Sequence, residues 1–264
     1  MTTLSTRRPA FSAVHAEWTK LRTVPGPVWL LAATIVLTVA VSTAATAATR
    51  CPGGTCFADT TKLSLTGVVF GQAVVAILAV LAIGGEYSTG MIRTTLTAMP
   101  RRGGMLAAKA AVVTGPVLAA AAIAVAGCLL AGRLILPGNG FTAARGLSLA
   151  DGPVLRAAAG SVLYLGLIAL LSLGIATAVR DTAVAIGIVL GLLYLFPVVA
   201  AVAANPRWQR HLEQIGPATA GLQIEATTGL RSLPISPWAG LGVLAAWAAG
   251  ALLAGGLALR WRDA

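Results

Sequence analysis

Long apolar stretches dominate the chain and are separated by shorter polar segments. A helix that crosses the ~30 Å hydrocarbon core of a bilayer needs about 20 apolar residues. Segments that satisfy this requirement lie at about residues 28–48, 63–84, 105–130, 154–179, 182–204 and 238–259. The pattern therefore predicts an all-α, polytopic membrane protein with six transmembrane helices, forming a single transmembrane domain over residues 1–264.

The composition of the chain agrees with a membrane protein. Of 264 residues, 57% are hydrophobic and 10% are charged, whereas an average soluble domain carries about 25% charged residues. There are too few polar side chains to cover a water-soluble surface, which excludes a soluble enzyme, a disordered tail and a disulfide-rich secreted domain.

The net charge of +11 comes from 19 Lys and Arg against 8 Asp and Glu. The basic residues form only short pairs between the apolar stretches. We therefore attribute them to membrane topology and to anionic lipid headgroups, and we expect no nucleic acid partner. More of them fall on the inner side if both termini are cytoplasmic, which predicts that orientation in the cell (cytoplasmic) membrane.

Two cysteines frame a short loop between the first two predicted spans. Cys51 and Cys56 enclose Pro-Gly-Gly-Thr, which permits a tight turn. In the predicted orientation this loop faces the oxidising side of the membrane, where a disulfide can form. A metal-binding pair is the alternative, although no histidine or further cysteine lies nearby in the sequence.

Residues 11–23 have the pattern of an amphipathic helix before the first span. The charged residues Glu17, Lys20 and Arg22 alternate with an apolar stripe. The stripe contains Phe11, Val14, Trp18 and Leu21. This helix is either a simple topology anchor at the inner membrane surface or a helix that packs against a cytoplasmic partner.

The segment over residues 86–100 follows the second predicted span. Glu86 stands where the apolar stretch ends, residues 88–98 can form a short helix, and Pro100 ends it. A short helix between the inner ends of two spans can transmit force from a soluble motor protein. An ordinary basic inner loop is the alternative.

Residues 205–237 form the longest loop, on the predicted outer side. Apolar and polar residues are mixed there, and Trp208 and Trp238 are placed at headgroup level. The pattern favours short interfacial or re-entrant helices, and a plain surface loop is the alternative.

Small residues recur within the spans at a spacing of four. Gly187 and Gly191 form a GxxxG pair, and Gly250 with Ala254 forms a similar pair. Such pairs allow two helices to approach closely, and we interpret them as packing contacts within the chain.

The motifs of the common enzyme classes are missing from the sequence. There is no GxxxxGK[ST], HExxH or GxSxG pattern. The two histidines, His15 and His211, are predicted on opposite sides of the membrane, and no predicted span carries paired carboxylates. We therefore expect a non-catalytic chain that binds no metal or cofactor itself, and that takes any energy for transport from another protein.

In the order of its short motifs the chain resembles the ABC-2 type transporter permeases, the membrane subunits of bacterial ABC exporters. Three segments carry the resemblance along the six-span chain. They are Glu17-Trp18-Thr19-Lys20-Leu21-Arg22 before the first span, Gly85-Glu86-Tyr87 and Gly90-Met91-Ile92-Arg93-Thr94-Thr95-Leu96 after the second, and Leu259-Arg260-Trp261-Arg262-Asp263-Ala264 at the end.

The resemblance implies roles for the segments outside the spans. Residues 11–23 would be an elbow helix, residues 86–100 a coupling helix seated in a groove of an ATPase subunit, and residues 205–237 an extracellular re-entrant segment. The elbow residues would include Glu17, Trp18, Lys20 and Arg22. The coupling residues would be Glu86, Tyr87, Gly90, Arg93, Leu96 and Arg101.

The resemblance also implies a function and partners. Two permease copies, identical or different, would join two ABC ATPase subunits, and ATP and Mg would bind to the ATPase alone. The complex would export a hydrophobic or amphipathic substrate such as a lipid, peptide or drug. The alternative is a non-transporting membrane anchor or regulator that recruits a cytoplasmic partner.

Overall fold

The computed structural model describes residues 25–51, 56, 58–88, 102–141, 151–202 and 204–262. All regular structure in these residues is helical, and six of the helices are long and apolar enough to cross a membrane. The prediction of an all-α, multi-pass membrane protein is confirmed at this level. The predicted elbow helix with Glu17, Trp18, Lys20 and Arg22 lies outside the described residues, as do Gly90, Arg93, Leu96 and Arg101.

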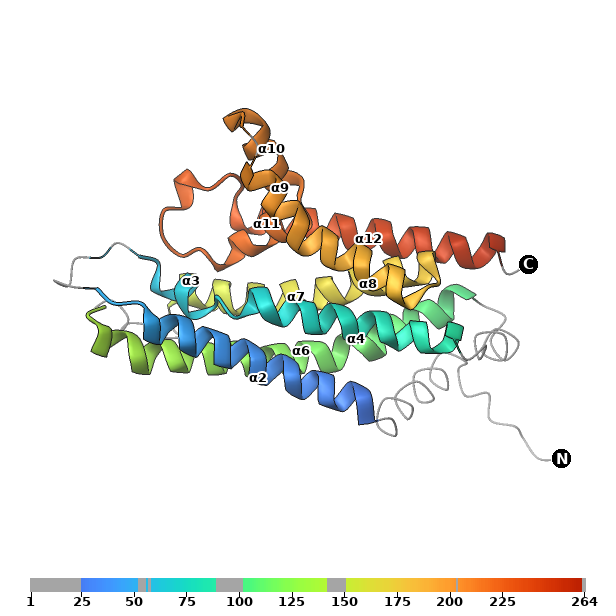
Figure 1. Cartoon of the computed structure of the whole chain (residues 1–264), viewed down its shortest axis with the longest axis horizontal. Coiled ribbons are helices and arrows are strands. Elements are labelled where there is room, and N and C mark those ends of the chain that lie inside the picture. Colours follow the sequence, from blue (N-terminus) through green and yellow to red (C-terminus); the bar gives the residue numbers. More distant parts are fainter. Residues whose placement is uncertain are drawn as a thin grey trace.

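The six long helices lie side by side along one axis (Figure 1). The fifth is composite, because a π-helical turn joins two α-helical pieces. The spans are α2 (Pro25–Ala48), α4 (Val68–Ser88), α6 (Arg102–Ile135), α7 (Gly152–Val179), α8–η3–α9 (Thr182–Leu190, Gly191–Leu195, Phe196–Val202) and α12 (Pro237–Arg262).

The two ends of the bundle differ in what they carry (Figure 1). One end carries the cysteine loop, the turn after α6 and the segment between α9 and α12, and we call it the disulfide end. The other end carries the start of α2, the end of α4 and the C-terminus of α12, and we call it the terminal end.

The second span begins later than the sequence predicted. It was expected from Leu63, but α4 starts at Val68, because residues 60–64 form the separate short helix α3 (Thr60–Ser64). The Asp59 side chain accepts a hydrogen bond from the backbone N–H of Lys62 at 3.1 Å and so caps α3. The third span is longer than predicted and continues into the 3-10 turn η1 (Leu136–Asn139).

The buried face of α2 is polar, although the helix as a whole is apolar. Its members are spaced by four residues, so they share one side of the helix. They are Thr34, Thr38, Ser42 and Thr46. The Ser42 hydroxyl accepts a hydrogen bond from the Gly67 N–H at 2.9 Å. A Cβ on Gly67 would lie 1.9 Å from the Thr38 carbonyl oxygen, so glycine is required for this approach of α2 to the start of α4.

Helix α7 is the central helix of the bundle and packs against α4, α6 and α12. Its closest approach to α12 occurs at Gly174. A Cβ there would lie 2.5 Å from the carbonyl carbon of Ala251 and 2.6 Å from the backbone nitrogen of Leu252. Gly255 of α12 contacts α7 at the same place, since a Cβ added to it would lie 2.8 Å from the Gly174 carbonyl oxygen.

The interpretation of the GxxxG pair as an internal packing contact is wrong for the described chain. A Cβ added at Gly187, Gly191 or Gly250 would meet nothing within 4 Å. The close backbone contact between α7 and α12 uses Gly174 and Gly255 instead. Glycine spacing alone cannot identify a contact, because it does not show which face of a helix meets a neighbour.

Two alanine substitutions test whether Gly174, rather than Gly187, lies in a helix contact. We expect Gly174→Ala to destabilise the chain by about 1–3 kcal/mol, because a methyl group must enter a filled contact. Gly187→Ala points into open space and should be neutral or slightly stabilising, since alanine is the better helix former. Thermal unfolding of both purified variants in detergent checks this, and equal midpoints would contradict the assigned α7–α12 contact.

Candidate functional site

The segment between α9 and α12 folds into short helices at the disulfide end. They are α10 (Pro206–Ile215), α11 (Pro217–Gly221), η4 (Leu222–Glu225) and η5 (Leu230–Ser232). The sequence predicted short helices in this loop. The part over residues 217–229, which we call the docked segment, packs against both α7 and α12 through α11 and η4.

The docked segment meets α7 well inside the length of that helix. A Cβ on Gly221 would lie 2.7 Å from a ring carbon of Tyr164, and a Cβ on Gly160 would lie 2.0 Å from the side chain of Ile224. At a rise of 1.5 Å per residue, these contacts are roughly 12–18 Å along α7 from its first residue. The chain between the fifth and sixth spans therefore lies alongside part of α7.

Glu225 is the buried carboxyl group of the docked segment. Its side chain is 3% exposed, and Oε1 has no hydrogen-bond partner among the described residues. Burial raises the pKa of Glu225 to about 8. The negative charge of Asp59 also raises this pKa, whereas the positive charge of Lys62 and a hydrogen bond with Ser161 lower it. At neutral pH the group is therefore mostly a neutral carboxylic acid.

Further polar side chains lie between the spans near Glu225. The Tyr164 hydroxyl of α7 donates a hydrogen bond to the Gln72 side-chain oxygen of α4, and both residues are buried. The Tyr194 hydroxyl, from the π-helical turn, donates to the Val69 carbonyl oxygen. We call Glu225, Ser161, Tyr164, Gln72 and Tyr194 the buried polar layer. It joins α4, α7, η3 and the docked segment.

Asp59 ties the docked segment to the loop after α2. Besides capping α3, its carboxylate accepts hydrogen bonds from the Thr227 hydroxyl at 2.7 Å and from the backbone N–H groups of Thr227 and Thr228. Burial alone would raise the pKa of Asp59, but these bonds and the one from the Lys62 N–H outweigh it and lower the pKa. The group stays ionised while Glu225 is neutral.

The two loop cysteines are joined in a disulfide between Cys51 and Cys56. The Cys51 N–H donates to the Asn139 carbonyl oxygen at 2.8 Å, which connects the loop to the turn after α6. Of the two alternatives that the sequence left open, the structure has the disulfide. In the part of the chain that is described, no three His, Cys, Asp or Glu side chains come together as metal ligands.

At the terminal end, Tyr87 is the predicted coupling residue whose side chain the structure describes. Its ring centroid lies 5.8 Å from the guanidinium carbon of Arg180, and its hydroxyl donates to the Thr177 carbonyl oxygen at 3.5 Å. Arg180 follows α7 with a φ of 66° and donates from Nη2 to the Ala258 carbonyl oxygen of α12 at 2.8 Å. Glu86 belongs to the last turn of α4, but its side chain is outside the description.

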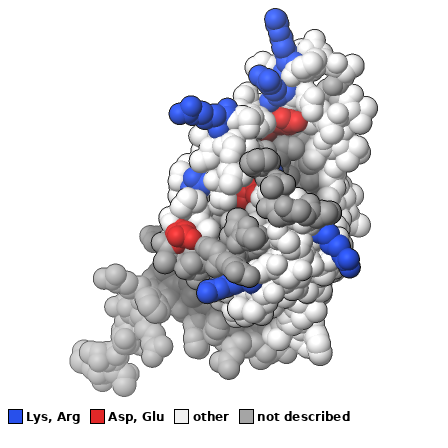
Figure 2. All heavy atoms as spheres, turned by 90° about the vertical axis from the view of Figure 1, so that its left-hand side faces the viewer, with Lys and Arg blue, Asp and Glu red and all other residues white. Residues whose placement is uncertain are grey.

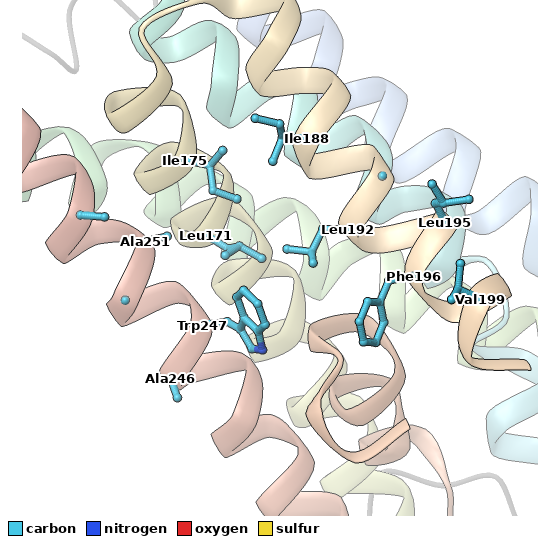
Figure 3. A pocket seen from close by; sticks show the side chains of 13 residues that line it. Leu171, Ile175, Ile188, Leu192, Leu195, Phe196, Val199, Ala246, Trp247 and Ala251 are labelled. Carbon is cyan, nitrogen blue, oxygen red and sulfur yellow. The ribbon is translucent and has the colours of Figure 1, made fainter. Parts of the chain in front are cut away.

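An apolar groove of about 870 Å³ lies between α7, α8–η3–α9 and α12 (Figure 3). Leu171, Leu192 and Phe196 line it from two helices, and Trp247 faces them from α12. The Trp247 indole N–H donates to the Ile215 carbonyl oxygen at 2.8 Å, so the last residue of α10 meets the groove.

Sequence reasoning missed Glu225, Asp59, Gln72 and Arg180 as site residues. Asp59 carries a usable signal, because an Asp directly before Thr-Thr-Lys is typical of a helix N-cap. Glu225 gives a weaker signal, a single acid in the stretch Gly-Leu-Gln-Ile-Glu-Ala. Glu225 is buried because the docked segment packs against α7, and no local sequence pattern predicts that contact.

The chain was also compared with known proteins. No family model matches it, and a search of curated proteins finds no match. The described residues therefore establish the class alone, a multi-pass membrane protein whose regular structure in those residues is helical, with six candidate spans.

The neutral state of Glu225 predicts a pH dependence of stability. The folded chain keeps this proton up to about pH 8, whereas an unfolded chain releases it near the ordinary glutamate value of about 4.3. The folded state therefore binds more protons in this window, and stability falls as the pH rises through it.

We expect the thermal midpoint in detergent to fall between about pH 5 and pH 8, and Glu225→Gln to remove that slope, because glutamine resembles the protonated acid. The matched control is Glu213→Gln on the more exposed helix α10, which should keep the slope. An unchanged slope in Glu225→Gln would show that another group titrates.

The hydrogen bonds of Asp59 predict a local effect of its removal. In Asp59→Ala, the backbone N–H groups of Lys62, Thr227 and Thr228 and the Thr227 hydroxyl lose their acceptor, and each donor left unsatisfied costs about 1–3 kcal/mol. We expect faster amide hydrogen exchange in residues 222–232. Asp181→Ala, which removes only the N-cap of α8, should leave exchange in that peptide unchanged. Equal exchange in both variants would exclude Asp59 as the anchor of the docked segment.

Proposed function

We propose that the chain is the permease subunit of an ATP-driven ABC exporter, which works with a separate ATPase subunit and a second permease copy. The observation that carries the proposal is the link at the terminal end, where Tyr87 contacts Arg180 and Arg180 bonds to α12. A force applied to the segment that follows α4 would reach α7 and α12 through these two side chains.

The cysteine loop supports the proposed orientation. A disulfide persists on the oxidising side of a membrane. The Cys51–Cys56 disulfide belongs to the connection between α2 and α3, which lies at the end of the bundle opposite to the end of α12 (Figure 1). The proposal therefore places both termini and the segment 86–100 in the cytoplasm, within reach of an ATPase. It places the docked segment on the outer side as the re-entrant element.

The proposed cycle uses α7 as the common element of both ends. ATP-driven closure of the ATPase pair would move residues 86–100, and Tyr87 and Arg180 would pass that motion to α7 and α12. The docked segment packs on these same two helices, so the outer side would open or close with them. This is alternating access between two states with different contacts. The low charge of the spans favours a hydrophobic or amphipathic substrate.

The proposal predicts which substitutions uncouple ATP hydrolysis. The tagged chain is extracted in mild detergent, and its partners are identified and assayed for ATPase activity in liposomes. We expect an ATPase in equal amount. We further expect Tyr87→Ala and Arg180→Ala to reduce permease-dependent hydrolysis about fivefold or more, within the usual range of coupling energies.

Two controls accompany this experiment. Tyr87→Phe keeps the ring beside Arg180 and should retain most of the activity. Arg133→Ala removes an exposed arginine at the other end and should have no effect. Recovery of the chain without an ATP-hydrolysing partner would contradict the proposal and favour a membrane anchor or regulator.

A further inference from the structure

Small residues leave room for the apolar groove. Gly191 and Gly250 line it, and a Cβ at either position would meet no atom within 4 Å. Ala246, Ala251 and Ala254 complete the α12 side. Every lining residue is apolar, and the groove runs between candidate spans, whose surroundings in a bilayer would be lipid acyl chains.

A polar cleft of about 500 Å³ lies on the other side of the end of α10. Arg210 from α10 and Arg231 from η5 both line it. Glu213 is the acidic member, and its carboxylate accepts a hydrogen bond from the Gln209 side chain at 3.2 Å. Two guanidinium groups against one carboxylate leave the cleft with a net positive charge, which suits a phosphate group.

The groove and the cleft are neighbours along the chain and in space. Ile215 accepts the hydrogen bond from Trp247, which lines the groove. The preceding residue, Gln214, lines the cleft and donates to the Pro234 carbonyl oxygen at 2.7 Å. The last turn of α10 therefore separates an apolar site within the bundle from a basic site at its end.

The described residues of the disulfide end carry an excess of positive charge. Figure 2 shows this end, with Lys and Arg side chains protruding around its edge. The basic members are Arg50, Lys62, Arg133, Arg156, Arg207, Arg210 and Arg231. The acidic members are Asp59, Asp151, Glu213 and Glu225, of which Glu225 is buried and neutral near pH 7.

We propose that the groove and the cleft together bind one phospholipid with an anionic headgroup, with an acyl chain against Gly250 and Trp247 and the phosphate at Arg210 and Arg231. Charge complementarity selects an anionic over a zwitterionic headgroup, and the acyl chain distinguishes a lipid from a free phosphate. This site is independent of the proposed export function, since it needs neither an ATPase nor a transported substrate.

The purified full-length chain allows a direct test. It is mixed in detergent with dioleoylphosphatidylglycerol or dioleoylphosphatidylcholine, and retained lipid is counted by native mass spectrometry. We expect one tightly held phosphatidylglycerol per chain. Gly250→Leu fills the groove and should weaken retention about tenfold, through the loss of a few buried methylene groups. Gly242→Leu is the matched control, because it is on the same helix, equally open and outside the groove.

The headgroup contacts are tested in the same assay. Arg210→Gln combined with Arg231→Gln should reduce the preference for phosphatidylglycerol over phosphatidylcholine about fivefold, as expected for exposed charge pairs. Arg207→Gln is on α10 but outside the cleft and should keep the preference. Thermal midpoints of all variants confirm that each is folded.

Three results would overturn the proposal. Retention that is the same in Gly250→Leu and wild type would exclude the groove as the acyl site. Competition by glycerophosphate, which has no acyl chain, would show a free phosphate site instead. Conversion of a dimer to a monomer by Gly250→Leu would show that a second copy of the chain occupies the groove.

Discussion

A polar group buried among apolar side chains must be hydrogen-bonded or uncharged. This requirement determines how the chain between the fifth and sixth spans packs against α7 and α12. Residues 217–229 return beside α7 without forming a span. Their one buried acid, Glu225, is 3% exposed, and burial raises its pKa to about 8 and so keeps it protonated at neutral pH. Another acid at this end, Asp59, stays ionised because it accepts hydrogen bonds from the N–H and O–H donors of residues 227 and 228. Glu225 is thus buried as a neutral acid, whereas the ionised Asp59 anchors the segment through hydrogen bonds.

Small residues serve two different purposes in the bundle. Gly67 and Gly174 allow backbones to touch, which brings α2 to α4 and α7 to α12. Gly191 and Gly250 instead leave the apolar groove open. Helix α7 connects these features, because it contacts the docked segment near Gly160, well inside its length, and leads into Arg180 at its C-terminal end.

The six spans and the all-helical class were predictable, because each span must supply about 20 apolar residues whatever its neighbours are. The disulfide was one of two readings of a local Cys-to-Cys spacing. The separate helix α3 was missed because hydropathy does not register the N-cap at Asp59. The GxxxG interpretation was wrong, and Glu225 was missed, for a common reason. Both depend on which faces meet in the folded bundle, which a single sequence does not reveal. The predicted roles of Glu86 and the other coupling residues stay predictions.

Infrared spectroscopy measures whether Glu225 is a neutral acid within the docked segment. A protonated carboxyl group has a C=O stretching band distinct from that of a carboxylate, and the difference between wild type and Glu225→Gln isolates the band of this residue. We expect a protonated band at neutral pH, which is lost as the pH rises because the pKa of Glu225 is about 8. A carboxylate band already present at about pH 6, well above the ordinary glutamate pKa, would contradict it.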